Sequence, residues 1–364
     1  MNKSFGRTHN PYNRALIPGG STGGNASLIS SAGSVMGIAS DIGGSTRLPA
    51  FFCGVYGHAC SVGSVPTDHQ WPPFAPSRLR MVSYGPMCRY AADLRPLVQM
   101  YMSKAAAGGK KEFSSLKLNE QVKPSQLKVF YLTSFSDPSL SPTDKPLVRA
   151  IQAAARHLQS LGATVREVKA AEELTGLSAG FDAWMVKMFE DDTLPFSLEL
   201  TNRNGHLNIY WELAKALVGL SEHTLPILFT ALFQTLKKAL AGAQAAREHC
   251  LAEHGRLKAA LHRLLGDDGV LLLPTYPELS VKPVSCFLKF NNTVYAGVFN
   301  TLQTVMTSIP LGLTIEEDGV RGGPVPLGIQ AVAKHCNDHL TLTVAELLDR
   351  QFGGWAPPTK VMIK

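Results

Sequence analysis

The sequence contains no run of 18 apolar residues, the length at which a segment becomes a candidate membrane span. Its longest apolar candidate, residues 224–236, is 13 residues long and is stopped by Lys237 and Lys238. The opening residues also lack the apolar region of a secretory signal peptide. The sequence therefore predicts neither a transmembrane segment nor a signal segment.

Paired cysteines and clustered charges are also missing. The six cysteines form no CxxC pair, which argues against a disulfide framework or a zinc site and predicts reduced thiols in a cytosol-facing compartment. The net charge of +7 is modest for 364 residues, and the basic residues are scattered. Scattered basic residues argue against nucleic-acid binding, which requires clustered ones. A small positive charge fits a weak attraction to anionic membrane surfaces at least as well as it fits nucleic-acid binding.

The hydrophobic content of 45% is enough for a sizeable core, and the patterning indicates an α/β fold. A strand over 127–135, a helix over 141–162 and a strand over 163–170 form a βαβ unit, which implies a parallel or mixed sheet. Residues 179–265 are almost wholly helical in pattern. We therefore expect a single domain over 1–364 with a helical insertion or cap at 179–265. Further elements are expected toward the C-terminus: strands over 269–275, 307–313 and 325–333, and a helix over 337–353 capped by Asn337 or Asp338.

The tetrapeptide GGST occurs twice, in PGGSTGG at 18–24 and in DIGGSTRLPA at 41–50. Each copy places a serine, Ser21 or Ser45, behind two glycines. Small and apolar residues at helical spacing predict a buried helix over 25–40 between the copies. A buried strand over 34–41 fits equally, because periodicity does not resolve short apolar runs.

Four interpretations of the repeat follow from the residues alone. The first interpretation is phosphate binding, but neither loop has the GK[ST] ending of a P-loop. An esterase-type nucleophile elbow, GxSxG at 19–23, would use Ser21 but has Pro18 where a strand should run. Both loops could be ordinary glycine turns. Alternatively the serines form one device, in which one hydroxyl is the nucleophile, the other relays its proton, and the loop N–H groups make an oxyanion hole.

The second GGST stretch, read with the first, resembles the amidase-signature hydrolases and, within them, the fatty-acid amide hydrolases. Other segments resemble that family in the same order: residues 85–98, 265–277, 295–302, 325–349 and 352–355. The resemblance covers nearly the whole chain. It implies a mixed β-sheet sandwiched by α-helices, incomplete at its N-terminus.

The resemblance also implies roles for individual residues. Ser45 matches the acylated nucleophile, and Ser21 matches the bridging serine that relays its proton. The Gly20–Ser21 peptide bond is cis in the family. Backbone N–H groups of the second loop match the oxyanion hole, and the remaining matched positions support the loops. The oxyanion-hole residues are Ile42, Gly43, Gly44 and Ser45, and the supporting residues are Gly20, Thr22, Asp41 and Arg47.

One member of the family's catalytic set has no match. The family's base is a lysine upstream of the first serine, and the only lysine there is Lys3, which lies outside any matching motif. The resemblance therefore implies an N-terminally truncated chain without the catalytic lysine and with impaired activity, since loss of a general base costs about 10²–10⁴-fold. The alternative is an inactive remnant that binds lipid or a protein partner.

The implied substrates are N-acylethanolamines and primary fatty amides, and no cofactor or metal is needed. The expected partners are the lipid amide, a membrane or lipid-droplet surface, and a second copy of the chain in a homodimer. Long apolar helical faces within 205–242 form either core or the part of a cap that touches lipid.

Overall fold

The protein is described by a computed structural model covering residues 5–68, 70–71, 73–107, 113, 116–120, 122–188, 195–240, 244–315 and 323–358. Eight strands form one mixed sheet in the spatial order β1-β3-β2-β7-β8-β6-β4-β5. Among the described strands, the parallel neighbours are β4–β6 and β4–β5, and the other pairs are antiparallel. The strands are β1 (Met36–Asp41), β2 (Tyr56–Ala59), β3 (Ser83–Cys88), β4 (Lys128–Tyr131), β5 (Thr164–Glu167), β6 (Gly269–Leu273), β7 (Val305–Leu313) and β8 (Pro326–Ala333).

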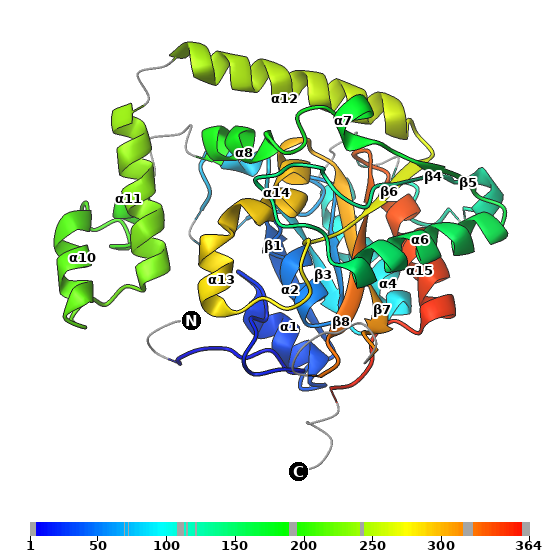
Figure 1. Ribbon diagram of the computed structural model, residues 1–364, viewed down its shortest axis with the longest axis horizontal. Coiled ribbons are helices and arrows are strands. Elements are labelled where there is room, and N and C mark those ends of the chain that lie inside the picture. The colour runs from blue at the N-terminus through cyan, green and yellow to red at the C-terminus, as the bar shows by residue number, and fades with distance from the viewer. Residues whose placement is uncertain are drawn as a thin grey trace.

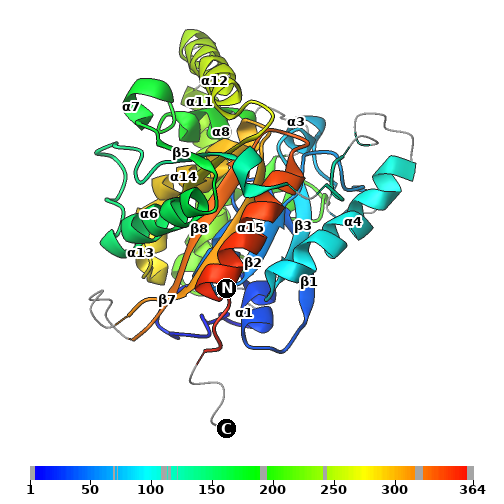
Figure 2. The ribbon, with the colours of Figure 1, turned by 90° about the vertical axis from the view of Figure 1, so that its right-hand side faces the viewer.

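Helices cover both faces of this sheet (Figures 1 and 2). Helices α4, α6 and α15 pack on one face, whereas α1, α2, α12 and α14 lie on the other. The predicted sandwich of a mixed sheet between helices is therefore confirmed. The helices are α1 (Gly23–Ser30), α2 (Arg47–Phe52), α3 (Pro76–Leu79), α4 (Ala91–Ala107), α6 (Lys145–Ser160), α7 (Ala170–Glu173), α8 (Gly180–Met188), α9 (Phe196–Glu199), α10 (Ile209–Leu217), α11 (Leu225–Leu240), α12 (Gln244–Leu265), α13 (Pro283–Leu288), α14 (Val294–Thr301) and α15 (Asp338–Phe352), with short 3₁₀ turns at Pro124–Gln126 and Phe290–Thr293.

Strand β6 shows how one sheet divides the core in two. Its side chains alternate between the faces, as in any strand. Val270 and Leu272 join the cluster under α6 and α15, whereas Leu271 and Leu273 join the cluster under α12 and α14. All four are fully buried, which explains why this strand is a continuous apolar run in the sequence.

The segment between the two GGST loops is a helix followed by a strand, so the helix prediction holds only for its first part and the strand alternative is confirmed by β1. Helix α1 ends at Ser30, Ala32 takes a positive φ of 59°, and the chain then enters β1. Six residue pairs join β1 to β3, so the strand is held by a partner distant in sequence. The expected burial is also wrong for part of this segment, because β1 lies at the sheet edge, where Ile38 is 53% exposed.

Residues 179–265 contribute helices α8 to α12 and no strand among their described residues. Helices α10 and α11 lie to one side of the sheet, whereas α12 runs along its top edge in the view of Figure 1. Among the residues described, none of the helices combines the length and apolarity needed to cross a bilayer.

Candidate active site

The two GGST loops meet at the N-terminal end of α2. Strand β1 ends at Asp41 and delivers the second loop, while the first loop precedes α1. The Thr22 N–H donates to the Ser45 carbonyl oxygen at 3.4 Å. Gly19 has a φ of +79°, and a Cβ there would lie 2.8 Å from the Pro49 backbone. The glycine therefore permits the close approach of the first loop to α2.

A buried ion pair fixes the second loop. Both Asp41 and Arg47 are fully buried, and Arg47 Nη2 lies 3.0 Å from Asp41 Oδ1. The carboxylate also accepts backbone N–H groups of the loop: Oδ1 from Gly44 at 2.7 Å and Oδ2 from Thr46 at 3.1 Å. One carboxylate thus bonds to both sides of Ser45. Because the carboxylate and both amides are buried, these bonds hold the loop in a single conformation.

Two further side chains complete this network. Arg47 Nη1 donates to Gln330 Oε1 at 2.9 Å, and its Nη2 donates to Asn300 Oδ1 at 2.6 Å. Asn300 returns its amide to Asp41, at 2.8 Å to the backbone oxygen and 3.0 Å to Oδ1. The loop is therefore tied to α14 through Asn300 and to β8 through Gln330.

The network sets the charge state of Asp41. Burial alone raises the pKa of a carboxyl group, but the Arg47 guanidinium and the hydrogen bonds from Arg47, Asn300 and Gly44 outweigh it and hold the Asp41 pKa below its usual value. Asp41 is therefore an anion at neutral pH. It serves as an acceptor of loop N–H groups, not as a proton donor.

The backbone N–H groups around Ser45 fall into two kinds. The Gly44 N–H is bonded to Asp41, whereas those of Ile42, Gly43 and Ser45 make no hydrogen bond within the part of the chain that the structure describes. The Ser45 side chain is partly exposed. These three N–H groups, next to a partly exposed serine, are donors of the kind that the predicted oxyanion hole requires.

The two loops are in contact through the Thr22 N–H and the Ser45 carbonyl oxygen, but no hydrogen bond of either serine hydroxyl to the other is found among the described residues. Ser21 is exposed, and its preceding peptide bond, Gly20–Ser21, is cis, as the resemblance implies. Within the described residues, no hydrogen bond joins Ser21 to Ser45, and no lysine hydrogen bonds to either. Lys3 lies outside the described residues.

A family model described as "Amidase" matches residues 1–342. The chain belongs to the amidase family. It is 37% identical over 366 residues to fatty-acid amide hydrolase 2 of Homo sapiens and 37% identical over 363 residues to fatty-acid amide hydrolase 2-B of Danio rerio. These alignments cover 99% and 98% of this chain, which spans 65% of the length of either relative.

The fold of this amidase-family chain is also that of solved amidases. The structure of 6-aminohexanoate cyclic dimer hydrolase superposes with a TM-score of 0.73 at 20% identity, covering 99% of this chain and 73% of that one. The amidase-signature resemblance and the α/β architecture predicted from it are therefore confirmed. At this identity the superposition establishes the fold alone.

Sequence reasoning missed three residues at this site of the amidase-family chain. Trp184 of α8 donates its indole N–H to the Ile42 carbonyl oxygen at 2.7 Å. Its ring lies so close that a Cβ at Gly43 would be 3.0 Å from it. Asn300 and Gln330 are the others, each a fully buried polar residue within an apolar stretch. A single polar residue within an apolar run is the sequence feature that could have identified both.

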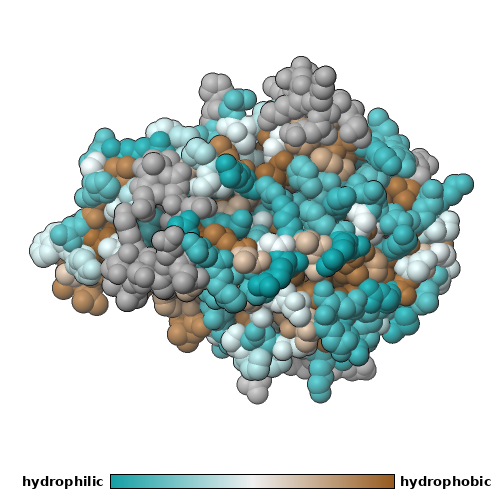
Figure 3. Space-filling model, turned by 90° about the horizontal axis from the view of Figure 1, so that it is seen from above, coloured by the Kyte–Doolittle hydropathy of each residue, from teal (hydrophilic) through white to brown (hydrophobic). Residues whose placement is uncertain are grey.

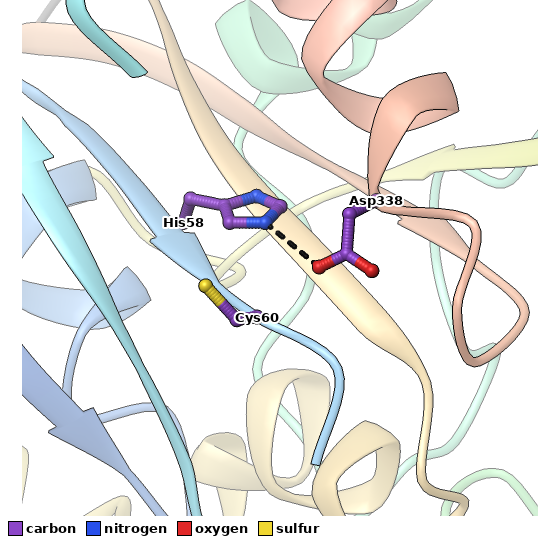
Figure 4. A group of neighbouring side chains, drawn as sticks. All are labelled: His58, Cys60 and Asp338. Carbon is purple, nitrogen blue, oxygen red and sulfur yellow. Dashed lines mark hydrogen bonds and ion pairs between the residues drawn. The ribbon is translucent and has the colours of Figure 1, made fainter. Parts of the chain in front are cut away.

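The start of helix α15 differs from the side-chain capping that the sequence predicted. Asn337 occupies the N-cap of α15 without a side-chain cap bond. Asp338 instead accepts from Ser61 Oγ at 2.5 Å and contacts His58 Nε2 at 3.2 Å (Figure 4). His58 Nδ1 in turn meets Thr307 Oγ1 at 2.8 Å. His58, Cys60 and Asp338 lie close enough to suggest a metal site, but these hydrogen bonds already engage the imidazole and the carboxylate. The cluster joins α15 to β2.

We expect Gly44→Ala to destabilise the amidase loop. Gly44 has a φ of +107°, and a Cβ there would lie 2.6 Å from Ala296 Cβ. The strained backbone and the clash together should cost about 2 kcal/mol or more of unfolding free energy in urea titration. The matched control is Gly24→Ala in α1, where a Cβ meets no atom within 4 Å. Equal stability of the two variants would contradict this account of the loop.

Proposed function

We propose that the chain is a serine amidohydrolase for amides of long-chain fatty acids. The observation that carries the proposal is the loop around Ser45, a partly exposed residue. The N–H groups of Ile42, Gly43 and Ser45 have no described partner, and the buried Asp41 carboxylate holds the loop through the Gly44 and Thr46 N–H groups. The names of the relatives, which are fatty-acid amide hydrolases, support the substrate class.

In the proposed reaction, Ser45 Oγ attacks the amide carbonyl carbon. Its proton passes to Ser21 Oγ, which gives up its own proton to a base. The N–H groups of Ile42, Gly43 and Ser45 stabilise the oxyanion of the tetrahedral intermediate. The proton then returns from the base through Ser21 to the amide nitrogen, the C–N bond breaks, the neutral amine leaves, and an acyl ester remains on Ser45. Water then hydrolyses this ester and regenerates the hydroxyl.

No base is assigned within the described residues. For the 364-residue chain we therefore propose slow turnover, lower by about 10²–10⁴-fold than with a general base in place. The second candidate is a lipid-binding protein without turnover. The observation that favours it is that neither serine hydroxyl hydrogen bonds to the other or to a described lysine.

The esterase alternative, in which Ser21 is the nucleophile of a GxSxG elbow, is disfavoured by the local structure. An elbow needs a strand running directly into the serine. Residues 13–22 form turns and irregular chain and lead straight into α1, with no strand in that stretch. Ser21 is proposed only as the relay.

Hydrolysis assays distinguish the candidates. The purified chain is incubated with a long-chain primary amide, its short-chain counterpart and the matching long-chain methyl ester, and released ammonia or acid is measured. The proposal expects slow, chain-length-dependent release of ammonia. Binding of the long-chain amide without any hydrolysis would support the lipid-binding candidate, and preference for the ester with loss in Ser21→Ala would support the esterase.

We also propose that α10, α11 and α13 form a cap that contacts a lipid surface. Apolar side chains lie exposed on these helices, and Figure 3 shows brown surface at the end of the molecule where α10 and α11 lie. Phe229 of α11 packs on Phe287 of α13 with ring centroids 5.5 Å apart, so the two helices share one apolar edge. The exposed apolar residues are Tyr210, Trp211, Leu217, Leu225, Phe229, Phe287 and Leu288.

The cap proposal predicts the effect of removing two of these side chains. Trp211 and Leu217 are 64% and 86% exposed. Replacing both by alanine removes about 2 kcal/mol of apolar transfer energy, so binding to phosphatidylcholine vesicles should weaken roughly 30-fold in sedimentation assays. Val35→Ser, which alters an apolar residue 69% exposed just before β1, is the matched control. Vesicle binding that the double variant leaves unchanged would refute the cap.

A further inference from the structure

A thiol and an imidazole form a pair at the turn between β8 and α15, away from the GGST loops in the sequence. Cys336 Sγ lies 3.1 Å from His335 Nδ1. Both residues are half-buried, so neither is enclosed in the core. Cys336 immediately precedes Asn337, the N-cap of α15. Thiols beside an imidazole and near a helix N-terminus are those whose thiolate is stabilised.

The second ring nitrogen decides how the pair shares its proton. His335 Nε2 lies 3.0 Å from the Val62 carbonyl oxygen, which only accepts, so Nε2 carries a hydrogen. In the neutral ring Nδ1 is then the unprotonated nitrogen. It therefore accepts the thiol proton of Cys336, which is the arrangement that converts a thiol to a thiolate beside an imidazolium.

The turn also holds the thiol in place. The Cys336 N–H donates to Ser61 Oγ at 2.7 Å, and Cys336 has a positive φ of 67°. Ser61 Oγ in turn donates to the buried carboxylate of Asp338. The backbone of Cys336 is thus anchored to a cluster that is itself fully buried, which keeps Sγ beside the imidazole.

Other titratable groups surround the turn. Asp338 of α15, with His58 of β2 bonded to it, lies behind Ser61. From α12, His262 interacts electrostatically with His335. Lys334 lies 2.9 Å from Asp267, so its positive charge is paired. Among the described residues, the charges around His335 and Cys336 are therefore mixed in sign, and the His335 imidazole lies within hydrogen-bond distance of the thiol.

The other described thiols are poor candidates for reaction. Burial raises the pKa of the thiols of Cys53, Cys60 and Cys88, and also that of Cys286. Cys250 lies within α12, a half-buried helical position. It is the natural comparator for Cys336, because its exposure is similar.

We propose that Cys336 is a reactive thiol and a site of covalent modification by small electrophiles and low-molecular-weight disulfides. With a disulfide, the Cys336 thiolate attacks one sulfur, the reagent's S–S bond breaks, and its other half leaves as a thiolate. The proton that Cys336 gave to His335 Nδ1 then passes to that thiolate through solvent. The product is a mixed disulfide at Cys336 and one free small thiol, so no further oxidant is needed.

Alkylation kinetics test the proposal. A Cys250→Ser chain is treated with iodoacetamide from pH 5.5 to 9.5, and carbamidomethyl groups are located by peptide mapping. We expect the midpoint of the rate profile at Cys336 about one unit or more below the ordinary thiol value of about 8.5, with labelling at pH 7 roughly threefold faster than at Cys250 in the unmodified chain. Oxidised glutathione should yield one mixed disulfide on the same peptide.

His335→Gln should return the midpoint of the alkylation profile at Cys336 to that of an ordinary thiol. The matched control Lys334→Gln, on the same turn, should leave this midpoint below the ordinary thiol value. Circular dichroism shows whether each variant is folded, and the profile of the parent chain tests the proposal even if His335→Gln does not fold. A parent profile centred at or above 8.5, or labelling no faster than at Cys250, would overturn the proposal.

Discussion

Replacement of Ser45 by alanine is expected to reduce amide hydrolysis to the uncatalysed background, a loss of at least about 10³-fold if turnover proceeds through an acyl ester. Ser21→Ala removes only the proposed relay, so we expect a smaller loss of about 10²-fold. The physical reason for the difference is that Ser45 forms the bond to the substrate carbonyl carbon, whereas Ser21 only transfers a proton.

The matched control is Ser31→Ala at the end of α1, which removes a hydroxyl outside both loops. Each variant is assayed with the same long-chain primary amide and compared by kcat/KM. A Ser45→Ala chain that retains the turnover of the parent would refute the assignment of the nucleophile, whatever the effect of Ser21→Ala.

The largest expected effect on stability comes from Arg47→Met. This change removes five hydrogen bonds made by the guanidinium, to Asp41 twice and to Ala296, Asn300 and Gln330. It also leaves the Asp41 carboxylate fully buried without its cation. Breaking a buried pair in this way costs about 3–5 kcal/mol of unfolding free energy.

Arg95→Met is the matched control, since Arg95 pairs with Glu346 in a partly exposed position and should cost about 1 kcal/mol or less. Urea unfolding of both variants and of the double variant Asp41→Asn/Arg47→Met measures how much the Asp41–Arg47 pair contributes to stability. The double variant should recover part of the unfolding free energy that Arg47→Met loses, because it leaves no buried unpaired charge. If Arg47→Met and Arg95→Met lose the same stability, the buried network does not hold the fold as described.

The same carboxylate gives a direction for acid stability. The Asp41 pKa is lower in the folded chain than in the unfolded chain, so its contribution is fully present above the unfolded value of about 3.9. The contribution is lost as the pH falls through the folded pKa.

The sequence predicted correctly those helices and strands whose pattern of apolar residues matches their burial in the fold. The apolar stripe of α6, from Leu147 to Leu158, and the continuous apolar run of β6 were both recognisable, because burial of each matches a simple periodicity. Strand β1 was ambiguous because its pairing with β3 depends on residues more than 40 positions away. No local pattern reports such a partner.

The residues of the candidate site also divide into those that a local motif predicted and those that only the tertiary packing reveals. Asp41 and Arg47 adjoin the repeated loop, so the motif and its resemblance pointed to them. Trp184 is 142 residues from the carbonyl group it contacts, and the packing of α8 on α14, α12 and α3 brings it there. Asn337 or Asp338 was predicted as the cap of α15, because capping is a common role of these residues before a helix. Asn337 occupies the N-cap position without a side-chain cap bond, and the Asp338 carboxylate bonds to a buried histidine and serine.

The central claim, that Ser45 is the nucleophile, is tested most directly by covalent labelling. The folded 364-residue chain is incubated for hours with a fluorophosphonate, and the adduct is counted by intact mass and located by peptide mapping. We predict a single, slowly formed adduct on Ser45 that is absent from Ser45→Ala. An adduct on Ser21 with Ser45 unmodified, or a folded chain in which Ser45 stays unmodified throughout, would contradict the account.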